Sequence, residues 1–236
     1  RMWFINQFDP TVPTYNLPFV VRLSGAVDLE ALIQALGDVL DRQESLRTIF
    51  PDSADGGYQK VLPMSEVGLG ITPIDVTEDE LASQLREFAA SGFDVTRELP
   101  IRVRIYQVQS AAVRAGGSEV AVAFVVHHIA ADGFSFGPLA RDVAFAYVAR
   151  SHGTAPSWNP LPVQYTDYTL WQRDLLGSES DPESMAAREI DYWRTALAGL
   201  PDQLDLPADR QRPAEQSFSG SRVGFRLPLA PREDTP

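Results

Sequence analysis

Two consecutive apolar segments, residues 101–108 and 118–129, place the strongest constraint on the fold of this chain. The first, "IRVRIYQV", alternates apolar and polar residues, as a strand with one buried face does. The second, "SEVAVAFVVHHI", is apolar at nearly every position of its middle, which indicates a strand covered on both faces. Gly116 and Gly117 between them favour a turn, so the sequence predicts a hairpin whose second strand is deeply buried.

Amphipathic helices and further strands flank this hairpin in the sequence. Asp28 suits the N-cap of a helix over residues 29–43, where leucine and valine recur at helical spacing. Thr77 and Glu80 form a capping-box pattern before a helix that ends near Gly92. Further strands are predicted over residues 17–25 and 45–50, and further helices over 138–150, 163–176 and 181–200. Because these elements lack the βαβ rhythm of a doubly wound sheet, we expect an α+β fold.

The charge and composition of the chain exclude several classes of partner. Its 32 acidic and 20 basic residues give a net charge of -12, which repels nucleic-acid phosphates and anionic lipid surfaces. There is no cysteine, so disulfides, thiolate metal sites and a cysteine nucleophile are excluded. No apolar run approaches the roughly 20 residues of a membrane span. We therefore expect a cytoplasmic protein that binds neither nucleic acid nor membrane.

Residues 125–137, "VVHHIAADGFSFG", contain two candidate reactive groups, a histidine and a serine. "GFSFG" fits the G-x-S-x-G pattern, but that pattern needs its serine on a sharp turn directly after a strand. Here the six residues from His128 to Gly133 intervene. A hydrolase triad would also have to use Asp142 and His152, which leaves no room for an intervening sheet. We expect Ser135 to cap the next helix or to hydrogen-bond the turn.

The two adjacent histidines cannot both serve one site if the strand remains extended through them. Neighbouring strand residues point to opposite faces, so at most one of His127 and His128 is catalytic. The chain has three histidines in all, and two of them are adjacent, so they provide no convergent metal-ligand set. Asp132 and Gly133 place a carboxylate and an uncovered backbone just beyond the pair. This arrangement suits an imidazole at the mouth of a substrate channel.

The motif "HHIAADG" resembles the HHxxxDG motif of the condensation domains of nonribosomal peptide synthetases, within the chloramphenicol-acetyltransferase-like superfamily. Three further segments fall in the order and spacing of that family. Residues 1–18 look like the tail of its opening motif, with Arg1 as the arginine. "RQESLRTIF" at residues 42–50 is similar to RHExLRTxF, and "YTDYTLW" at residues 165–171 is similar to YxDYAxW. The resemblance covers nearly the whole chain.

The resemblance implies a chloramphenicol-acetyltransferase-like lobe, a mixed sheet flanked by helices, over residues 1–176. Residues 177–236 would form a crossing helix, a linker and the start of a second, similar lobe whose remainder is absent. Two residues depart from the family pattern: Gln43 replaces the usual histidine of the second motif, and Phe134 stands where tryptophan is common. We expect both departures to tune the channel.

The activity that the resemblance implies is peptide-bond formation. The α-amine of an acceptor aminoacyl group, held on one carrier protein, attacks a donor acyl thioester held on another. The second histidine of the motif, His128, is the catalytic position. His127 is expected to pack inward, and Gly133 to let a pantetheine arm pass close to the backbone. Asp132 could orient His128 or pair with an arginine and hold the turn, and the resemblance implies an ion pair with Arg47. The sequence leaves open whether His128 acts as a base or positions the amine.

The implied partners are the donor and acceptor peptidyl carrier proteins, an adjacent adenylation domain and the missing C-terminal lobe. No metal and no cofactor of its own is expected, because phosphopantetheine arrives on the carrier proteins. Three alternatives remain open. They are an epimerization domain or related acyltransferase that uses the same histidine, a non-catalytic module that docks carrier proteins, and a hydrolase that uses Ser135.

Overall fold

The computed structural model describes residues 2–54, 56–109, 119–201, 204, 207, 210 and 223–226. The chain divides into two compact units, Arg1–Ala196 and Leu197–Pro236. In the second unit, the described residues form no helix or strand. Arg1 and most of residues 202–236, the predicted linker and start of a second lobe, lie outside the described residues. The boundary predicted after residue 176 remains a prediction, and the first unit extends twenty residues beyond it.

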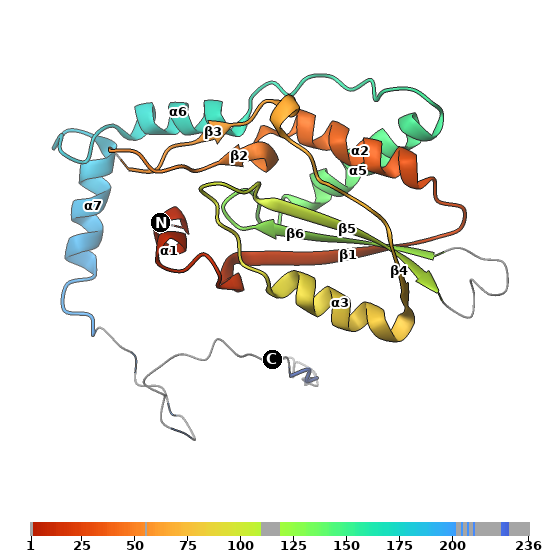
Figure 1. Cartoon of the computed structure of the whole chain (residues 1–236). Coiled ribbons are helices and arrows are strands. Elements are labelled where there is room, and N and C mark those ends of the chain that lie inside the picture. Colours follow the sequence, from red (N-terminus) through yellow and green to blue (C-terminus); the bar gives the residue numbers. More distant parts are fainter. Residues whose placement is uncertain are drawn as a thin grey trace, which may run out of the picture. The chain divides into compact units, whose positions relative to one another are not determined.

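A four-stranded mixed sheet forms the centre of the first unit (Figure 1). Its order is β1 (Asn16–Ser24), β6 (Glu119–His127), β5 (Ile101–Gln109) and β4 (Ile74–Thr77). β6 pairs antiparallel with both β1 and β5, whereas β4 runs parallel to β5. The predicted pairing of the two apolar segments is thus confirmed, although the turn at Gly116 and Gly117 lies outside the described residues.

Helices cover both faces of this sheet, which confirms the α+β class. Figure 1 shows α2 (Leu29–Arg42) and α5 (Phe136–Ser151) on one side and α3 (Glu78–Ala90) on the other. Alternate residues of β6 enter two separate cores. Val120, Val122, Phe124 and Val126 pack in the core that contains α2 and α5, and Ala121, Ala123 and Val125 pack in the core that contains α3. β6 is therefore buried on both faces, as its composition predicts.

Local hydrogen bonds begin two helices where the sequence predicts them. Asp28 Oδ1 accepts from Ala31 N at 3.0 Å at the start of α2. At the start of α3, Thr77 Oγ1 accepts from Glu80 N at 3.3 Å, and Glu80 Oε2 accepts from Thr77 N at 2.8 Å. These bonds satisfy backbone N–H groups that the helices cannot pair internally.

The strand predicted over residues 45–50 is mostly a helical turn. The 3-10 helix η2 (Glu44–Arg47) precedes the two-residue strand β2 (Thr48–Ile49), which pairs with β3 (Lys60–Val61) in a separate sheet. Thr48 Oγ1 donates to Glu44 O at 2.7 Å. Such a side-chain bond to the preceding turn competes with extended backbone, which explains the difference.

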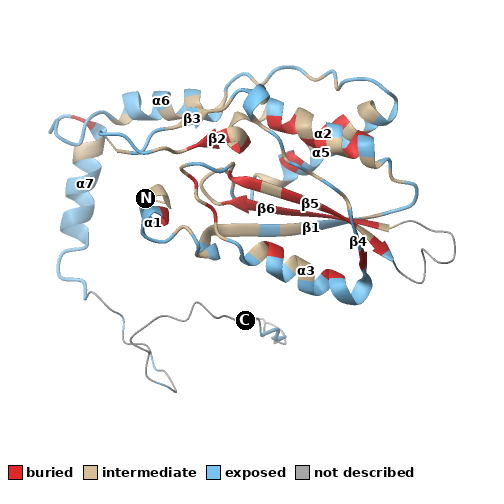
Figure 2. Cartoon of the chain, viewed as in Figure 1, coloured by how far each residue is buried: buried red, intermediate tan, exposed pale blue. Residues whose placement is uncertain are grey.

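The remaining elements lie around the sheet. α1 (Met2–Phe8), which the sequence did not predict, is held by Trp3 Nε1, which donates to Phe50 O at 2.8 Å, and by Asn6 Nδ2, which donates to Phe93 O at 2.8 Å. Two short 3-10 helices are η1 (Pro13–Tyr15) and η3 (Met64–Glu66). The predicted C-terminal helices are α6 (Tyr165–Leu176) and α7 (Met185–Ala196). Figure 2 shows β6 and much of β5 buried, whereas β1 has no buried residue and α6 and α7 are largely exposed.

Candidate active site

The end of β6 is fixed from both neighbouring strands. His127 N donates to Pro100 O at 2.8 Å, just before β5, and His128 N donates to Tyr15 O at 2.8 Å, just before β1. The backbone of the histidine pair is therefore tied to both sides of the sheet. This fixes the face of the sheet from which each histidine side chain projects.

His127 points into the protein, as the strand alternation predicts. It is 3% exposed and lies against the rings of Tyr15 and Phe93, with ring centroids 6.0 Å and 5.9 Å away. Its Nδ1 accepts from Ile129 N at 3.1 Å, so that nitrogen carries no proton. Burial, helped by the nearby His128, lowers the pKa of His127 from 6.5 to about 4. His127 is thus a neutral structural residue at pH 7.

His128 faces the other way, into a cavity of about 630 Å³. This open cavity, called the His128 cavity below, is lined by residues of α1, the segment after α2, the turn after β6, and α6 with the loop before it. The lining residues are Met2, Gln43, Ser45, His128, Ile129, Ala130, Ala131, Asp132, Ser135, Leu161, Val163, Gln164, Tyr165 and Tyr168. The structure therefore brings His128 together with Asp132 and with residues of two segments that carry the resemblance, 42–50 and 165–171.

Asp132 and Ser135 hold the turn between β6 and α5. Asp132 Oδ1 accepts from Phe134 N at 3.0 Å, from Ser135 N at 3.0 Å and from Ser135 Oγ at 2.8 Å. Ser135 Oγ in turn accepts from Asp132 N at 3.0 Å. The hydroxyl of Ser135 is the largest of several influences that lower the pKa of Asp132. The prediction that Ser135 hydrogen-bonds the turn is confirmed, and in the described part of the chain Asp132 makes no hydrogen bond to His128.

The ion pair between Arg47 and Asp132 that the resemblance implies is not formed. Arg47 Nε donates to Leu40 O at 3.2 Å, and its Nη1 donates to Leu62 O at 2.6 Å. Its charged partner is Glu44, at 3.3 Å. The guanidinium instead satisfies a carbonyl at the end of α2, where the helix dipole favours a cation. The Oδ1 atom of Asp132 is meanwhile occupied by its own turn.

Gly133 lies on open backbone. A Cβ atom added there would meet no heavy atom within 4 Å, and its φ lies outside the left-handed range that favours glycine. Neither backbone strain nor packing within the described chain therefore requires glycine at this position.

The serine hydrolase alternative fails on geometry. Asp142, its required acid, accepts from Arg42 Nε at 3.1 Å and from Gln43 Nε2 at 2.8 Å. His152, its required base, follows the far end of the 16-residue helix α5, and its Nδ1 contacts Val148 O at 2.7 Å. Ser135 lies at the opposite end of that helix, so the three groups cannot form a relay.

The contact between Gln43 and Asp142 is a site feature that the sequence did not predict. Asp142 is only 8% exposed, and it lies on α5 between apolar positions that face the core. A carboxylate in such a pattern indicates a buried polar partner, because unpaired charges are rarely buried. The sequence does not say which residue is that partner.

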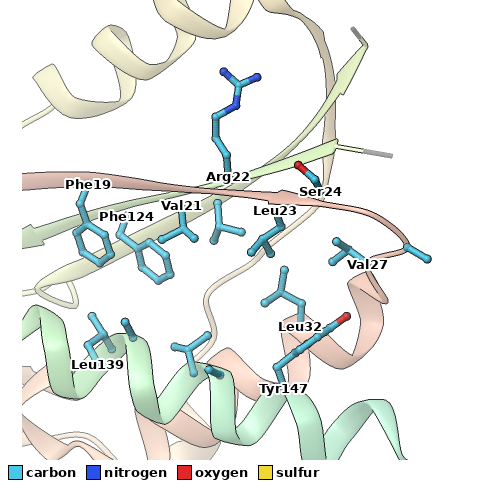
Figure 3. A pocket seen from close by; sticks show the side chains of 15 residues that line it. Phe19, Val21, Arg22, Leu23, Ser24, Val27, Leu32, Phe124, Leu139 and Tyr147 are labelled. Carbon is cyan, nitrogen blue, oxygen red and sulfur yellow. The ribbon is translucent and has the colours of Figure 1, made fainter. Parts of the chain in front are cut away.

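A second cavity, of about 450 Å³, lies between β1 and α5 and is mostly apolar (Figure 3). Phe19, Phe124 and Leu139 line it, and Figure 3 shows Arg22 pointing away toward the other side of the strand. Tyr147 Oη accepts from Asp28 N at 3.1 Å. No histidine or carboxylate lines this cavity, so the His128 cavity is the better candidate for acid–base chemistry.

Two absences concern the described residues alone. They contain no cluster of three or more histidine, aspartate or glutamate side chains arranged to hold a metal ion. None of the described helices has both the length and the apolar character needed to cross a membrane.

Comparison with known proteins decides the family. The family model described as "Condensation domain" matches residues 1–235. The chain belongs to the condensation-domain family. This confirms the resemblance carried by residues 127–133, 1–18, 42–50 and 165–171, and it agrees with the mixed, helix-flanked sheet.

Relatives and solved structures agree with a condensation domain. A probable non-canonical nonribosomal peptide synthetase, CymA, from Salinispora arenicola (strain CNS-205) is 49% identical over 227 residues. A dimodular nonribosomal peptide synthase from Bacillus subtilis (strain 168) is 43% identical over 227 residues. Each match covers 96% of this chain, but only 3% and 9% of the respective relative. The X-domain in its complex with OxyB from teicoplanin biosynthesis is 36% identical, with a TM-score of 0.79. That match covers 91% of this chain and 45% of the X-domain chain.

Proposed function

We propose that this condensation-domain chain carries the catalytic histidine for peptide-bond formation between two carrier-bound substrates. The donor is an acyl or peptidyl thioester on one carrier protein. The acceptor is an aminoacyl thioester on another, and its α-amine is the nucleophile. Membership of the condensation-domain family supports amide-bond formation in general.

The observation that carries the proposal is the division between the two histidines. His127 is buried and held neutral, whereas His128 lines a cavity of about 630 Å³, a volume within the range of ligand-binding pockets. Of the common side chains, imidazole is the one suited to accept a proton near neutral pH. His128 is therefore the histidine available to a substrate.

The reaction requires the protein to hold the two substrates close together and to supply one proton acceptor. A neutral amine attacks the thioester carbonyl, and the nitrogen must lose a proton as the carbon–nitrogen bond forms. His128 accepts or shares that proton, and the carbon–sulfur bond then breaks. Holding both substrates in reacting geometry can itself supply roughly 7–11 kcal/mol in favourable cases. We favour positioning with hydrogen bonding as the main contribution of His128.

Phosphopantetheine on the carrier proteins would enter the cavity as part of the substrates, so the chain needs no cofactor of its own. Gly133 supports this proposal, because its open backbone leaves room for an arm to pass close to the turn after β6. The further partners proposed are the adjacent adenylation domain and the C-terminal lobe. A match that covers only 45% of the X-domain chain is consistent with a missing lobe.

A second candidate function is a module that binds a protein partner without catalysis. The observation in its favour is the likeness to an X-domain in a complex with OxyB. The intact motif at residues 127–133 favours catalysis instead. Epimerization through the same histidine is a further alternative within enzymes.

The test joins the chain to the C-terminal half of a condensation domain and supplies loaded donor and acceptor carriers. Peptide formation is compared for the unchanged protein, His128→Ala and the matched control His152→Ala, whose histidine is exposed at the end of α5. We expect loss of product only in His128→Ala. Equal rates for all three would refute the proposal. Deuterium exchange at Cα of a carrier-bound aminoacyl group without an acceptor would indicate epimerization, and carrier binding without product would indicate docking.

A further inference from the structure

Gln43 connects a buried carboxylate to the His128 cavity. It is the C-cap of α2, is partly buried and lines the cavity. Its Nε2 donates to Asp142 Oδ2 at 2.8 Å. Asp142 comes from α5 and is fixed in turn by Arg42 Nε, which donates to the same oxygen at 3.1 Å. One end of the amide is thus anchored on the protein, which leaves Oε1 for the cavity.

The chemistry of Asp142 determines which end of the amide is anchored. A carboxylate paired with a guanidinium is ionised and can only accept hydrogen bonds. The amide nitrogen must therefore face it, because the flipped amide would place two acceptors together. Among the described residues, no donor reaches Gln43 Oε1. Gln43 Oε1 is therefore an uncharged hydrogen-bond acceptor without a described partner, on a residue that lines the cavity.

Two other polar side chains on the cavity wall, those of Gln164 and Tyr168, already make hydrogen bonds. Gln164 Nε2 donates to Arg42 O at 3.0 Å, and its Oε1 accepts from Glu44 N at 3.3 Å. Tyr168 Oη accepts from Gln172 Nε2 at 3.1 Å. Gln43 differs from Gln164 because its Oε1 accepts from no described donor, and it differs from Tyr168 because its available atom is an acceptor, whereas the Tyr168 hydroxyl can still donate.

We infer that Gln43 Oε1 is a second hydrogen-bond acceptor for the nucleophilic nitrogen, held in place by Asp142. This inference rests on the proposed function. A primary amine has two N–H bonds, and both become more acidic as the carbon–nitrogen bond forms. His128 takes one proton, while Oε1 accepts a hydrogen bond from the other N–H. The carbon–sulfur bond breaks, and the proton held by His128 passes to the departing sulfur.

The inference predicts that the contribution of Gln43 depends on the number of N–H bonds in the acceptor. A glycyl acceptor has two, whereas an N-methylglycyl acceptor has one, which His128 uses. Gln43→Leu keeps the approximate size of the side chain and removes the acceptor. With a glycyl acceptor we expect kcat to fall roughly 10- to 100-fold, the usual effect of losing a hydrogen bond to a group that gains charge. With an N-methylglycyl acceptor we expect only about a twofold change.

The experiment uses the chain joined to the rest of a condensation domain, with both acceptors on the same carrier. Gln34→Leu is the matched control, because Gln34 lies on the exposed face of α2 and donates only to Glu30, at 3.3 Å. The control should behave as the unchanged protein with both acceptors. An equal loss with both acceptors, or no loss with either, would overturn the inference. Failure of the proposed function is distinguishable, because His128→Ala would then be as active as the unchanged protein.

A second variant keeps the inference testable if Gln43→Leu does not fold. In Gln43→His, a neutral imidazole can donate to Asp142 with one nitrogen and accept from the amine with the other. The protonated ring only donates, and the adjacent carboxylate favours protonation. We expect near-normal kcat at pH 8 and a loss relative to the unchanged protein as the pH falls toward 6. The same pH profile for both proteins would contradict the role of Oε1 as an acceptor.

Discussion

Removing the titratable group at position 127 should make the stability of this protein less sensitive to acid. The pKa of His127 is about 4 in the folded chain, whereas its ordinary value of 6.5 applies in the unfolded chain. Because the folded chain binds this proton less readily, protonation favours unfolding. The stabilisation associated with neutral His127 is complete above pH 6.5 and is lost as the pH falls toward 4. At about 1.4 kcal/mol for each pH unit, the loss amounts to roughly 3 kcal/mol.

The substitution His127→Asn isolates this effect. An asparagine Oδ1 can still accept from Ile129 N, which now donates to His127 Nδ1 at 3.1 Å. The variant loses ring packing against Tyr15 and Phe93, and that cost does not depend on pH. We therefore expect His127→Asn to be less stable at pH 7 and to approach the unchanged protein as the pH falls.

Equilibrium urea unfolding between pH 7 and pH 4 measures the difference. The gap in unfolding free energy between the two proteins should narrow by about 3 kcal/mol over this range. Carboxylates titrate in both proteins and cancel in the comparison. His152→Asn serves as the control, because this histidine is exposed and should give a curve parallel to that of the unchanged protein. Parallel curves for His127→Asn as well would refute the argument.

Three further predictions test other parts of the structure. Thr77→Ala removes half of the capping box at α3 and should cost about 1 kcal/mol of unfolding free energy, measured by urea titration, whereas Thr77→Ser should cost little. Arg47→Met and Asp132→Asn should have additive effects on stability in a double-mutant cycle, because the two residues have separate partners; a clear coupling between them would show that they do interact. Gly133→Ala should leave the thermal midpoint unchanged, since its Cβ meets no neighbour, but should slow peptide formation if a pantetheine arm passes there; full activity would exclude that path.

Local physical chemistry made much of the fold predictable. The capping bonds of Asp28 and Thr77 join residues three apart, so their patterns are visible in sequence. The strand predicted over residues 45–50 was only partly right, because just Thr48 and Ile49 are extended and the residues before them form a helical turn. The bond from Thr48 Oγ1 to Glu44 O favours a turn, and composition alone does not reveal it. α1 was missed because its anchors, Phe50 and Phe93, are distant in sequence.

The sequence by itself determined that the two histidines point to opposite sides, one into the protein and the other away from it. An extended strand sends neighbouring side chains to opposite faces, and the apolar composition of β6 buries both of its faces. The alternation of side chains along a strand depends only on the local backbone, so it does not depend on how the other elements pack.

Only the tertiary structure decided which polar groups meet around His128. Gln43 and Asp142 are 99 residues apart in sequence, and they meet because α2 packs beside α5 on the same face of the sheet. Arg47 bonds the carbonyls of Leu40, in the last turn of α2, and Leu62, just after β3, and it does not pair with Asp132. Short hydrogen bonds depend on positions to within about half an ångström. Periodicity predicts which face a residue occupies, but the partner across that face is fixed only when the helices pack.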